Sequence, residues 1–220
     1  MQINENIISS LMEKLEKNNM KPYFCNTGAE AKELVMSLIK EGDTVTNGGS
    51  VTMKEIGVMD AVKERKDITY LDRNAEGLTA KEVKEIYKKA FFADVYLMSS
   101  NAITLNGELY NVDGNSNRVA ALLYGPESVI VVCGINKIVE NLDEAVKRVK
   151  TIAAPKNTVR LHTGSYCENA GECMSLKNDG AFMCDGCSGT GRICCNYVVS
   201  AQQRHKDRIK VILVNESLGY

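Results

Sequence analysis

The stretch that decides the fold is DTVTNGGSVTMKEIG, residues 43–57. Residues 43–46 predict a short strand, and the glycine-rich residues 47–50 predict the turn that follows it. Thr52 and Glu55 have the spacing of a capping box, in which a threonine hydroxyl and a glutamate bind the first free N–H groups of a helix. The stretch therefore predicts a strand, a tight turn and a helix in immediate succession, the start of a β-α-β unit.

The same alternation continues on both sides of this stretch. Three further capping signals have the same spacing: Thr27 with Glu30, Thr79 with Glu82, and Asn141 with Glu144. Runs of apolar and β-branched residues predict strands at 23–25, 68–71, 95–98, 129–132 and 208–214. Pro155 is expected to end the helix that Asn141 begins. Strands that alternate with helices predict an α/β fold, in which helices cover both faces of a mainly parallel sheet.

One segment interrupts the alternation. Residues 103–105 and 108–110 flank Asn106-Gly107, the dipeptide most suited to a two-residue hairpin turn, where both central residues need positive φ. We therefore expect a β-hairpin inserted into the α/β pattern.

Length and charge limit the classes of function. The 220 residues suffice for one domain with a sizeable core. The 27 basic and 28 acidic residues give a net charge of −1, so no bulk positive field is available to hold nucleic acid. The N-terminus MQINENIISS lacks a signal-peptide pattern, and no apolar run reaches the roughly 20 residues of a membrane span. We expect a single cytoplasmic domain over residues 1–220.

Six of the eight cysteines lie close together, in the order Cys167-x5-Cys173-x10-Cys184-x2-Cys187-x6-Cys194-Cys195. A reducing cytosol disfavours disulfides, so a group this dense is more typical of a metal site. Residues 163–196 are rich in Gly, Ser and Asn and show no helical or strand periodicity. We therefore expect an insertion before the last strand, and we expect a bound ligand to organise this insertion. The Cys-x2-Cys pair has the geometry by which two thiolates reach one metal or one cluster.

This spacing leaves the identity of the metal open. Four thiolates suit either tetrahedral zinc or an iron–sulfur cluster. Adjacent Cys194 and Cys195 do not normally bind one ion together, so one of them is expected to be spare. His162 could replace a thiolate in a zinc site, although a single histidine before a turn is more typical of a polar surface. Free or redox-active thiols are the remaining alternative.

The turn at residues 47–50 is a second candidate site. Free N–H groups between a strand and a helix attract anions, and glycine allows a ligand to approach the backbone, although an ordinary βα turn has the same sequence. Glu108 is the candidate acid, base or nucleophile. Asn101 and the polar run that ends at Arg118 are expected to line the same cleft, where Arg118 could grip a carboxylate or phosphate; a capped loop is the alternative.

Six motifs in combination resemble the lactate-utilisation (LUD) domain family, over nearly the whole chain. They are NGGSVTMKEIG (47–57), ADV (93–95), NAITLNGEL (101–109), NKIV (136–139), RIC (192–194) and VNESLGY (214–220). The resemblance implies a place in the superfamily of phosphosugar isomerases and coenzyme A transferases. It therefore implies a single LUD-like domain with a Rossmann-like three-layer α/β core. By position, it implies that Gly48, Gly49 and Ser50 bind an anionic ligand and that Glu108 is the acidic residue of that cleft; Asn47, in the same turn, is a further candidate ligand-binding residue.

The resemblance also implies a set of metal ligands. Members usually carry Cys-x5-Cys-x2-Cys-x6-Cys, and Cys167, Cys184, Cys187 and Cys194 fit this pattern apart from an insertion at residues 173–183. That insertion brings Cys173, which is the alternative second ligand.

These observations lead to three hypotheses. The first is an accessory protein of lactate or related organic-acid oxidation, with a [4Fe–4S] cluster, a small anionic metabolite in the cleft and redox proteins as partners. The second is a transferase or isomerase acting on a small molecule that bears coenzyme A or phosphate, with Glu108 catalytic and structural zinc at the cysteines. The third is a non-catalytic binding module. The sequence leaves open whether the chain forms a homo-oligomer.

Overall fold

A six-stranded parallel sheet forms the centre of the molecule, in the order β1-β10-β7-β4-β2-β3. The computed structural model describes residues 3–177 and 182–220. The strands of this central sheet are β1 (Lys21–Cys25), β2 (Thr44–Asn47), β3 (Thr69–Leu71), β4 (Val95–Met98), β7 (Ser128–Gly134) and β10 (Ile209–Val214). The predicted α/β class and the mainly parallel sheet are confirmed.

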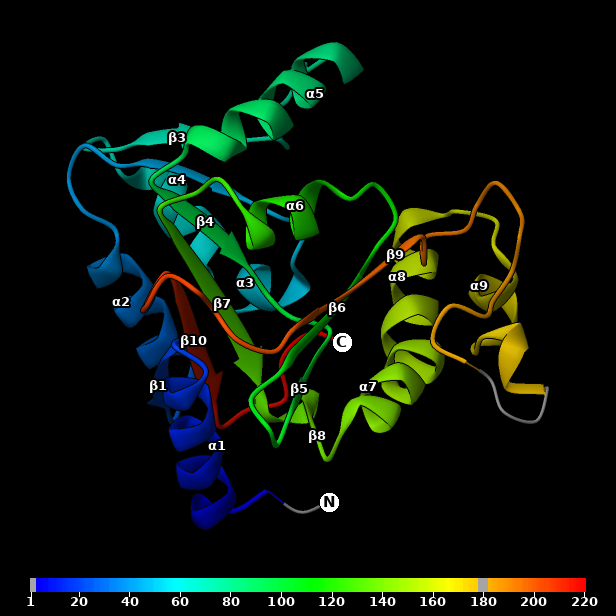
Figure 1. The fold of residues 1–220 in the computed structure, drawn as a ribbon. Helices are drawn as coiled ribbons and strands as arrows, with labels where there is room; N and C mark the ends of the chain where they lie inside the picture. Colours follow the sequence, from blue (N-terminus) through cyan, green and yellow to red (C-terminus); the bar gives the residue numbers. More distant parts are fainter. Residues whose placement is uncertain (1–2, 178–181) are drawn as a thin grey trace.

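Helices cover both faces of this sheet (Figure 1). On one face lie α1 (Glu5–Lys17) and α6 (Asn117–Leu123), and on the other lie α2 (Gly28–Leu38), α3 (Val51–Glu55) and α4 (Val58–Glu64). Strand β7 shows why two cores form. Because successive side chains of a strand point to opposite faces, Val129 and Val131 pack into one core while Ile130 and Val132 pack into the other.

The chain contains further short helical segments. They are α5 (Ala80–Lys89), α7 (Leu142–Arg148), α8 (Ala154–Leu161), α9 (Tyr166–Ala170), a π-helical turn at Val149–Ala153, and 3-10 turns at Ala90–Phe92, Ile135–Lys137 and Met174–Lys177. In Figure 1, α7, α8 and α9 stand together at one side of the central sheet.

The predicted hairpin belongs to a second, four-stranded sheet of order β8-β5-β6-β9. Its strands are β5 (Ala102–Thr104), β6 (Leu109–Asp113), β8 (Ile138–Val139) and β9 (Asn196–Ser200). A third core joins this sheet to α7, the π-helical turn and the start of α8. Strand β9 was not predicted, because the cysteine-rich segment was expected to end at residue 196 and no strand was expected between that residue and residue 208. That segment therefore leads into the second sheet before the chain returns to β10.

The hairpin turn differs from the prediction. Gly107 has φ of +79°, whereas Asn106 is not among the described residues with positive φ. The Gly107 N–H donates to the Thr104 carbonyl at 2.9 Å, and the Thr104 N–H donates to the Glu108 carbonyl at 3.0 Å. These bonds define a three-residue loop with one left-handed glycine, the next most common hairpin connection.

Two predicted helix boundaries were wrong. The N-cap of α3 is Ser50, whose hydroxyl accepts a hydrogen bond from the Met53 N–H at 3.2 Å. Thr52 is buried instead and donates to the carbonyl of Leu218, so a tertiary contact takes its hydroxyl away from capping. Pro155 does not end the helix. It lies in the first turn of α8, directly after the π-helical turn, where the altered hydrogen-bond register accommodates a residue without an N–H.

The cysteine segment contains more regular structure than its composition suggested. Helix α9 and the 3-10 turn Met174–Lys177 both fall within residues 163–196.

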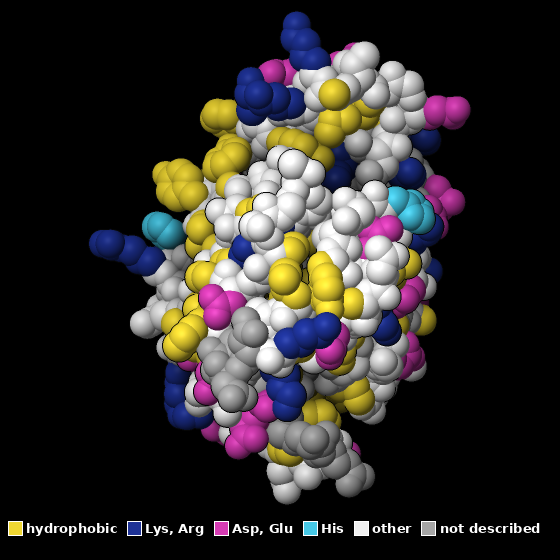
Figure 2. Space-filling view, turned by 90° about the vertical axis from the view of Figure 1, so that its right-hand side faces the viewer, with side chains coloured by type: hydrophobic (Ala, Val, Ile, Leu, Met, Phe, Trp, Pro, Cys, Tyr) yellow, Lys and Arg dark blue, Asp and Glu magenta, His cyan; other side chains and the backbone are white. Residues whose placement is uncertain are grey.

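Figure 2 shows the side of the molecule on the right of Figure 1, on which basic and acidic side chains are interspersed. Within residues 3–177 and 182–220, no helix is both long and apolar enough to cross a membrane.

Candidate functional site

A cleft of about 820 Å³ lies at the carboxyl edge of the central sheet. The residues that follow three neighbouring strands line it: 47–51 after β2, 99–101 after β4, and Lys137 shortly after β7. Ligands of open α/β sheets bind at this edge, because the strands end there and the connecting loops diverge. The sequence-predicted residues Asn47, Gly48, Gly49, Ser50, Asn101 and Arg118 all line this cleft.

The described lining of the cleft has a strong excess of positive charge. Two aspartates, Asp60 and Asp113, face seven cationic residues: Lys54, Lys63, Arg73, Arg118, Lys137, Arg160 and Arg192. A concave surface lined mainly by one sign of charge concentrates ligands of the opposite sign. The cleft therefore suits an anion, although the chain as a whole is nearly neutral.

Lys137 is the most unusual of these cations. It is only 3% exposed, and its Nζ donates to the hydroxyls of Thr52 at 2.9 Å and of Ser99 at 2.8 Å. Among the described residues, no carboxylate lies within 4.0 Å of this Nζ. A buried ammonium without an ionic partner is costly, and an anionic ligand would supply the missing charge.

The surroundings of Lys137 also change its titration. The pKa of Lys137 is lowered to about 8, mainly by burial; the guanidinium groups of Arg148 and Arg118 contribute to the lowering, and Cys133 and Glu55 oppose it. A lysine with such a pKa keeps most of its charge at neutral pH but loses it under mildly alkaline conditions. Perturbed lysines of this kind are typical of functional sites.

Arg118 has a different role from the one the sequence suggested. Its Nη1 donates to the Ser99 carbonyl and the Asn111 side chain, and its Nη2 donates to Asn101 Oδ1 at 3.1 Å and the Val112 carbonyl at 2.8 Å. Its Nε lies 3.6 Å from Asp113 Oδ2. Because these acceptors engage every side of the guanidinium, Arg118 holds the residues after β4 against β6 and adds positive potential to the cleft.

The glycine turn approaches this arginine closely. A Cβ atom at Gly48 would lie 2.9 Å from Arg118 Cγ and 3.1 Å from the hydroxyl of Tyr96. The N–H of Gly48 donates to the Leu97 carbonyl at 2.9 Å, so this group continues the sheet. Gly49 is exposed, and a Cβ there would meet nothing closer than 4.0 Å. Of the two glycines, Gly48 is needed for packing, whereas Gly49 faces the open cleft.

Glu108 is not brought into the cleft. It does not line the cavity, and it lies in the hairpin connection, where its carboxylate accepts a hydrogen bond from the Thr104 hydroxyl at 2.6 Å. Asn18 at the end of α1 donates to the neighbouring carbonyl of Gly107. Asn101 and Asp113 stand at the opposite end of the hairpin, so Glu108 and the cleft lie at different ends of the second sheet.

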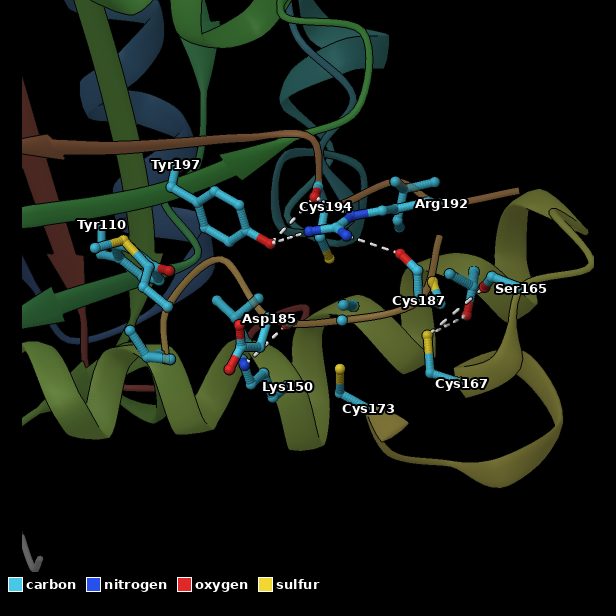
Figure 3. Close-up of a pocket in the computed structure, with 17 residues that line it drawn as sticks. Tyr110, Lys150, Ser165, Cys167, Cys173, Asp185, Cys187, Arg192, Cys194 and Tyr197 are labelled. Atoms are coloured by element: carbon cyan, nitrogen blue, oxygen red, sulfur yellow. Dashed lines mark hydrogen bonds between the residues drawn. The ribbon is translucent and has the colours of Figure 1, made fainter. Parts of the chain in front are cut away.

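A smaller pocket of about 20 Å³ lies between the cysteine segment and the helices α8 and α9. Cys167, Cys173, Cys187 and Cys194 all line it, and Figure 3 shows their side chains around this space. We call it the thiol pocket. Cys167 comes from α9, Cys173 precedes the 3-10 turn, and the other two come from the segment that leads to β9. Three predicted ligands and the alternative ligand Cys173 are thus brought together.

The other candidates lie outside this pocket. Cys184 and Cys195 are exposed, and neither lines the thiol pocket. His162 is exposed at the end of α8, with φ of +51°. Within the described residues, no three Cys, His, Asp or Glu side chains form a group that could hold a single metal ion.

Hydroxyl groups surround two of the four thiols. Cys167 Sγ lies 3.7 Å from the Thr158 hydroxyl and 3.6 Å from the Ser165 hydroxyl, and Cys173 Sγ lies 3.3 Å from the Ser175 hydroxyl. Such groups can donate hydrogen bonds to metal-bound thiolates. The pKa of Cys194 is raised to about 12, mainly by burial and in addition by the neighbouring Cys167 and Cys173.

Two cations complete the walls of the thiol pocket. Lys150 is 5% exposed, and its Nζ donates to the Ser175 hydroxyl at 2.7 Å and to the carbonyls of Phe182 and Asp185. Arg192 donates to three cysteine carbonyls: Cys194 at 2.7 Å, Cys187 at 2.7 Å and Cys184 at 2.8 Å. Within the described part of the chain, neither cation has a carboxylate within 4.0 Å.

Sequence analysis missed Lys137, Lys150 and Arg192. One signal could have identified Lys137, since it comes three residues after an apolar strand, at the edge where ligands bind. Lys150 lies in an ordinary amphipathic helical pattern and Arg192 in a glycine-rich loop, and neither context distinguishes them from surface cations.

The sheet order, the two helical layers and the cleft define an α/β protein with a parallel central sheet and a cation-lined cleft at its carboxyl edge. Residues 8–214 match the LUD domain, and the chain belongs to this family, which is associated with lactate utilisation. The expected family is thereby confirmed.

One solved structure supports the fold. A DUF162 family protein from Deinococcus radiodurans has a TM-score of 0.54 at 13% identity, and the alignment covers 97% of this chain and 99% of that one. The β subunit of eIF2B from Chaetomium thermophilum is more distant, with a TM-score of 0.36 at 18% identity over 65% of this chain and 45% of that one. No curated protein matches the chain.

Proposed function

We propose that this protein is an accessory protein of lactate or related organic-acid oxidation, which carries a [4Fe–4S] cluster and binds a small organic anion. The cluster ligands are Cys167, Cys173, Cys187 and Cys194. The observation that carries the proposal is that these four thiols, spread over 28 residues of sequence, line one pocket. This set replaces Cys184, which the family spacing favoured, by Cys173.

The chemistry of the pocket supports a metal–thiolate centre over free thiols. Four thiolates bring more negative charge than the metal of a zinc site or a [4Fe–4S] centre neutralises, so the centre is anionic. Lys150 and Arg192 place two cations in the walls without a carboxylate partner among the described residues. The hydroxyls of Ser165 beside Cys167 and of Ser175 beside Cys173 are placed to donate to thiolates.

The family supports a redox-active centre over zinc. Oxidation of a hydroxy acid releases electrons, which zinc cannot carry because it has no redox chemistry. When bound, an iron–sulfur cluster would supply reversible one-electron transfer. The chain's own residues would hold the cluster, exclude water from it and set its charge environment.

The cleft supplies the anion-binding part of the proposal. Its excess of cations and the buried, unpaired Lys137 favour a small carboxylate, with the hydroxyls of Ser99 and Thr52 orienting the ammonium. We further propose that the protein acts in the cytoplasm with redox partner proteins.

Anaerobic purification followed by metal and sulfide analysis tests the central step. We expect iron and acid-labile sulfide in equal amounts, about four of each per chain, with a brown chromophore that bleaches on reduction. A colourless protein with stoichiometric zinc would contradict the cluster, and a metal-free protein that binds neither iron nor zinc would contradict any metal centre.

A further inference from the structure

The cleft and the thiol pocket share a wall. Val149, Ala154, Arg192, Ile193 and Cys194 line both cavities. Cys194 is a proposed cluster ligand. An anion in the cleft and a cluster in the thiol pocket would therefore lie on opposite sides of the wall that contains Cys194.

Arg192 connects this wall to the cluster ligands. Its three nitrogens donate to the carbonyls of Cys184, Cys187 and Cys194, and Nη2 also donates to the Tyr197 hydroxyl at 3.0 Å. The Tyr197 hydroxyl in turn donates to the Cys194 carbonyl at 3.1 Å. The guanidinium is thus fixed to the backbone of two proposed ligands while it contributes positive charge to the cleft.

The π-helical turn forms the opposite part of the shared wall. Val149 lines both cavities, Lys150 lines only the thiol pocket, and Ala153 lines only the cleft. The extra residue of a π turn rotates successive side chains relative to a regular helix, and such turns are frequent at functional sites. Here one helical turn presents residues to two different cavities.

We propose that residues 192–194 and the π-helical turn couple the two sites, so that an anion bound in the cleft lowers the reduction potential of the metal centre. This inference rests on the proposed function. Reduction adds one electron to an already anionic centre, and no bond in the bound anion forms or breaks. An anion on the other side of the shared wall makes this addition less favourable, because like charges repel.

Thermodynamic linkage makes the effect reciprocal. If the anion lowers the potential, the oxidised protein must bind the anion more tightly than the reduced protein by the same free energy. A one-electron centre that binds an anion tenfold more tightly when oxidised shows a shift of about 59 mV. The cleft would then release its anion when the centre receives an electron.

A redox titration of the iron-loaded full chain, with dithionite as the electron donor, tests the coupling. Pyruvate and inorganic phosphate serve separately as probes, at concentrations that saturate binding, and chloride at equal ionic strength serves as the reference. We expect a negative shift with at least one probe, corresponding to about tenfold tighter binding to the oxidised protein. An unchanged potential in a protein shown by calorimetry to bind the probe overturns the coupling.

Two variants locate the effect. Lys137→Met removes the buried cation of the cleft without touching the thiol pocket, so we expect the same chromophore and iron content but no probe-induced shift. Lys206→Met removes an exposed lysine near the start of β10, at the opposite edge of the sheet, and should retain the full shift. A shift that persists in Lys137→Met would place the acting anion outside the cleft and overturn the inference.

A second measurement separates this inference from the proposed function. If the protein contains zinc, the cluster proposal is wrong, but coupling still predicts that pyruvate or phosphate changes the rate at which a chelator removes the metal. An equal rate with and without either anion would overturn the coupling as well.

Discussion

The cleft and the thiol pocket are built in different ways. The cleft has a volume of about 820 Å³, and its main residues follow the carboxyl ends of central strands whose side chains are fully packed. The thiol pocket has a volume of about 20 Å³, and two of its four cysteines lie in the glycine-rich segment between residues 182 and 195.

This difference separates a preformed site from one that its ligand must complete. The cleft exists because parallel strands end together, so folding of the core creates it. The thiol pocket is nearly closed around its sulfur atoms, and a bound cluster would have to spread the segment that carries Cys187 and Cys194. We expect metal binding to move the segment that carries Cys187 and Cys194, and to leave the part of the cleft formed by residues 47–51, 99–101 and Lys137 nearly unchanged.

The largest predicted effect concerns Cys173. Cys173→Ser removes one of the four thiols of the pocket, and we expect it to lose most of its iron and chromophore, because an incomplete ligand set holds a centre weakly. Cys184→Ser is the matched control and should keep both, since Cys184 lies outside the pocket. Iron content and visible absorption after anaerobic purification measure the result. The reverse outcome would restore the ligand set implied by family spacing.

Next comes Lys137→Met, which concerns only the cleft. We expect pyruvate or phosphate affinity to fall by at least about 30-fold, since removing one partner of a buried charged contact costs about 2–5 kcal/mol. The same variant should raise the free energy of unfolding by roughly 1 kcal/mol, because it replaces a buried unpaired ammonium by an apolar side chain. Calorimetry and urea unfolding measure the two changes. A loss of stability together with unchanged affinity would show that Lys137 is structural.

A pair of glycine substitutions tests how tightly the cleft is built. Gly48→Ala places a Cβ 2.9 Å from Arg118 Cγ, and we expect a loss of about 1–3 kcal/mol in unfolding free energy from overpacking. Gly49→Ala meets only Arg160, at 4.0 Å, and should change stability by less than about 0.5 kcal/mol. Urea unfolding of both variants measures the two free energies of unfolding. Equal values would mean that the turn and Arg118 shift to accommodate the added Cβ without cost.

The pKa of Lys137 predicts a pH dependence. The pKa is about 8 in the folded chain and has an ordinary value of 10.5, so the unfolded chain binds more protons between these values. Stability attributable to this residue therefore rises with pH across that window and is constant below it. Anion affinity shows the opposite trend and should fall up to about tenfold per pH unit above pH 8. Comparison with Lys137→Met, which should lack both trends, isolates the residue; identical profiles would refute the assignment.

The smallest effect is expected at Glu108. Glu108→Ala should change probe affinity less than about twofold, because the carboxylate lies outside the cleft. Its stability should fall by about 0.5–1.5 kcal/mol, since the Thr104 hydroxyl loses its acceptor. A large loss of affinity, measured by the same calorimetry, would mean that Glu108 reaches the ligand after a rearrangement of the hairpin.

Much of the central fold followed from local signals. Capping residues such as Thr27 and Thr79 accept the hydrogen bonds that their sequence spacing predicts, and all predicted strands of the central sheet are present. Errors arose where a distant contact competed with a local one. Thr52 fits a cap but bonds Leu218, and Asn106-Gly107 fits a two-residue turn but joins a three-residue loop against Asn18.

The two candidate sites were predictable to different degrees. Cysteine spacing identified a candidate metal-binding segment, but spacing alone could not choose between Cys173 and Cys184, since either could be the second ligand of the expected pattern. The glycine turn marked the cleft, but the residue that most distinguishes it is Lys137, from another strand. Its low exposure and lack of a carboxylate partner among the described residues are properties of the assembled core.

By itself, the sequence determined the parallel α/β core and the segment that gathers the cysteines, because periodicity, capping and residue spacing act over a few neighbouring residues. Only the tertiary structure decided which four thiols meet, which lysine is buried without a carboxylate partner in the described chain, and that one wall separates the two sites. These properties depend on side chains from strands and helices far apart in the chain. Their distances, burial and charge environment are set only when the core packs.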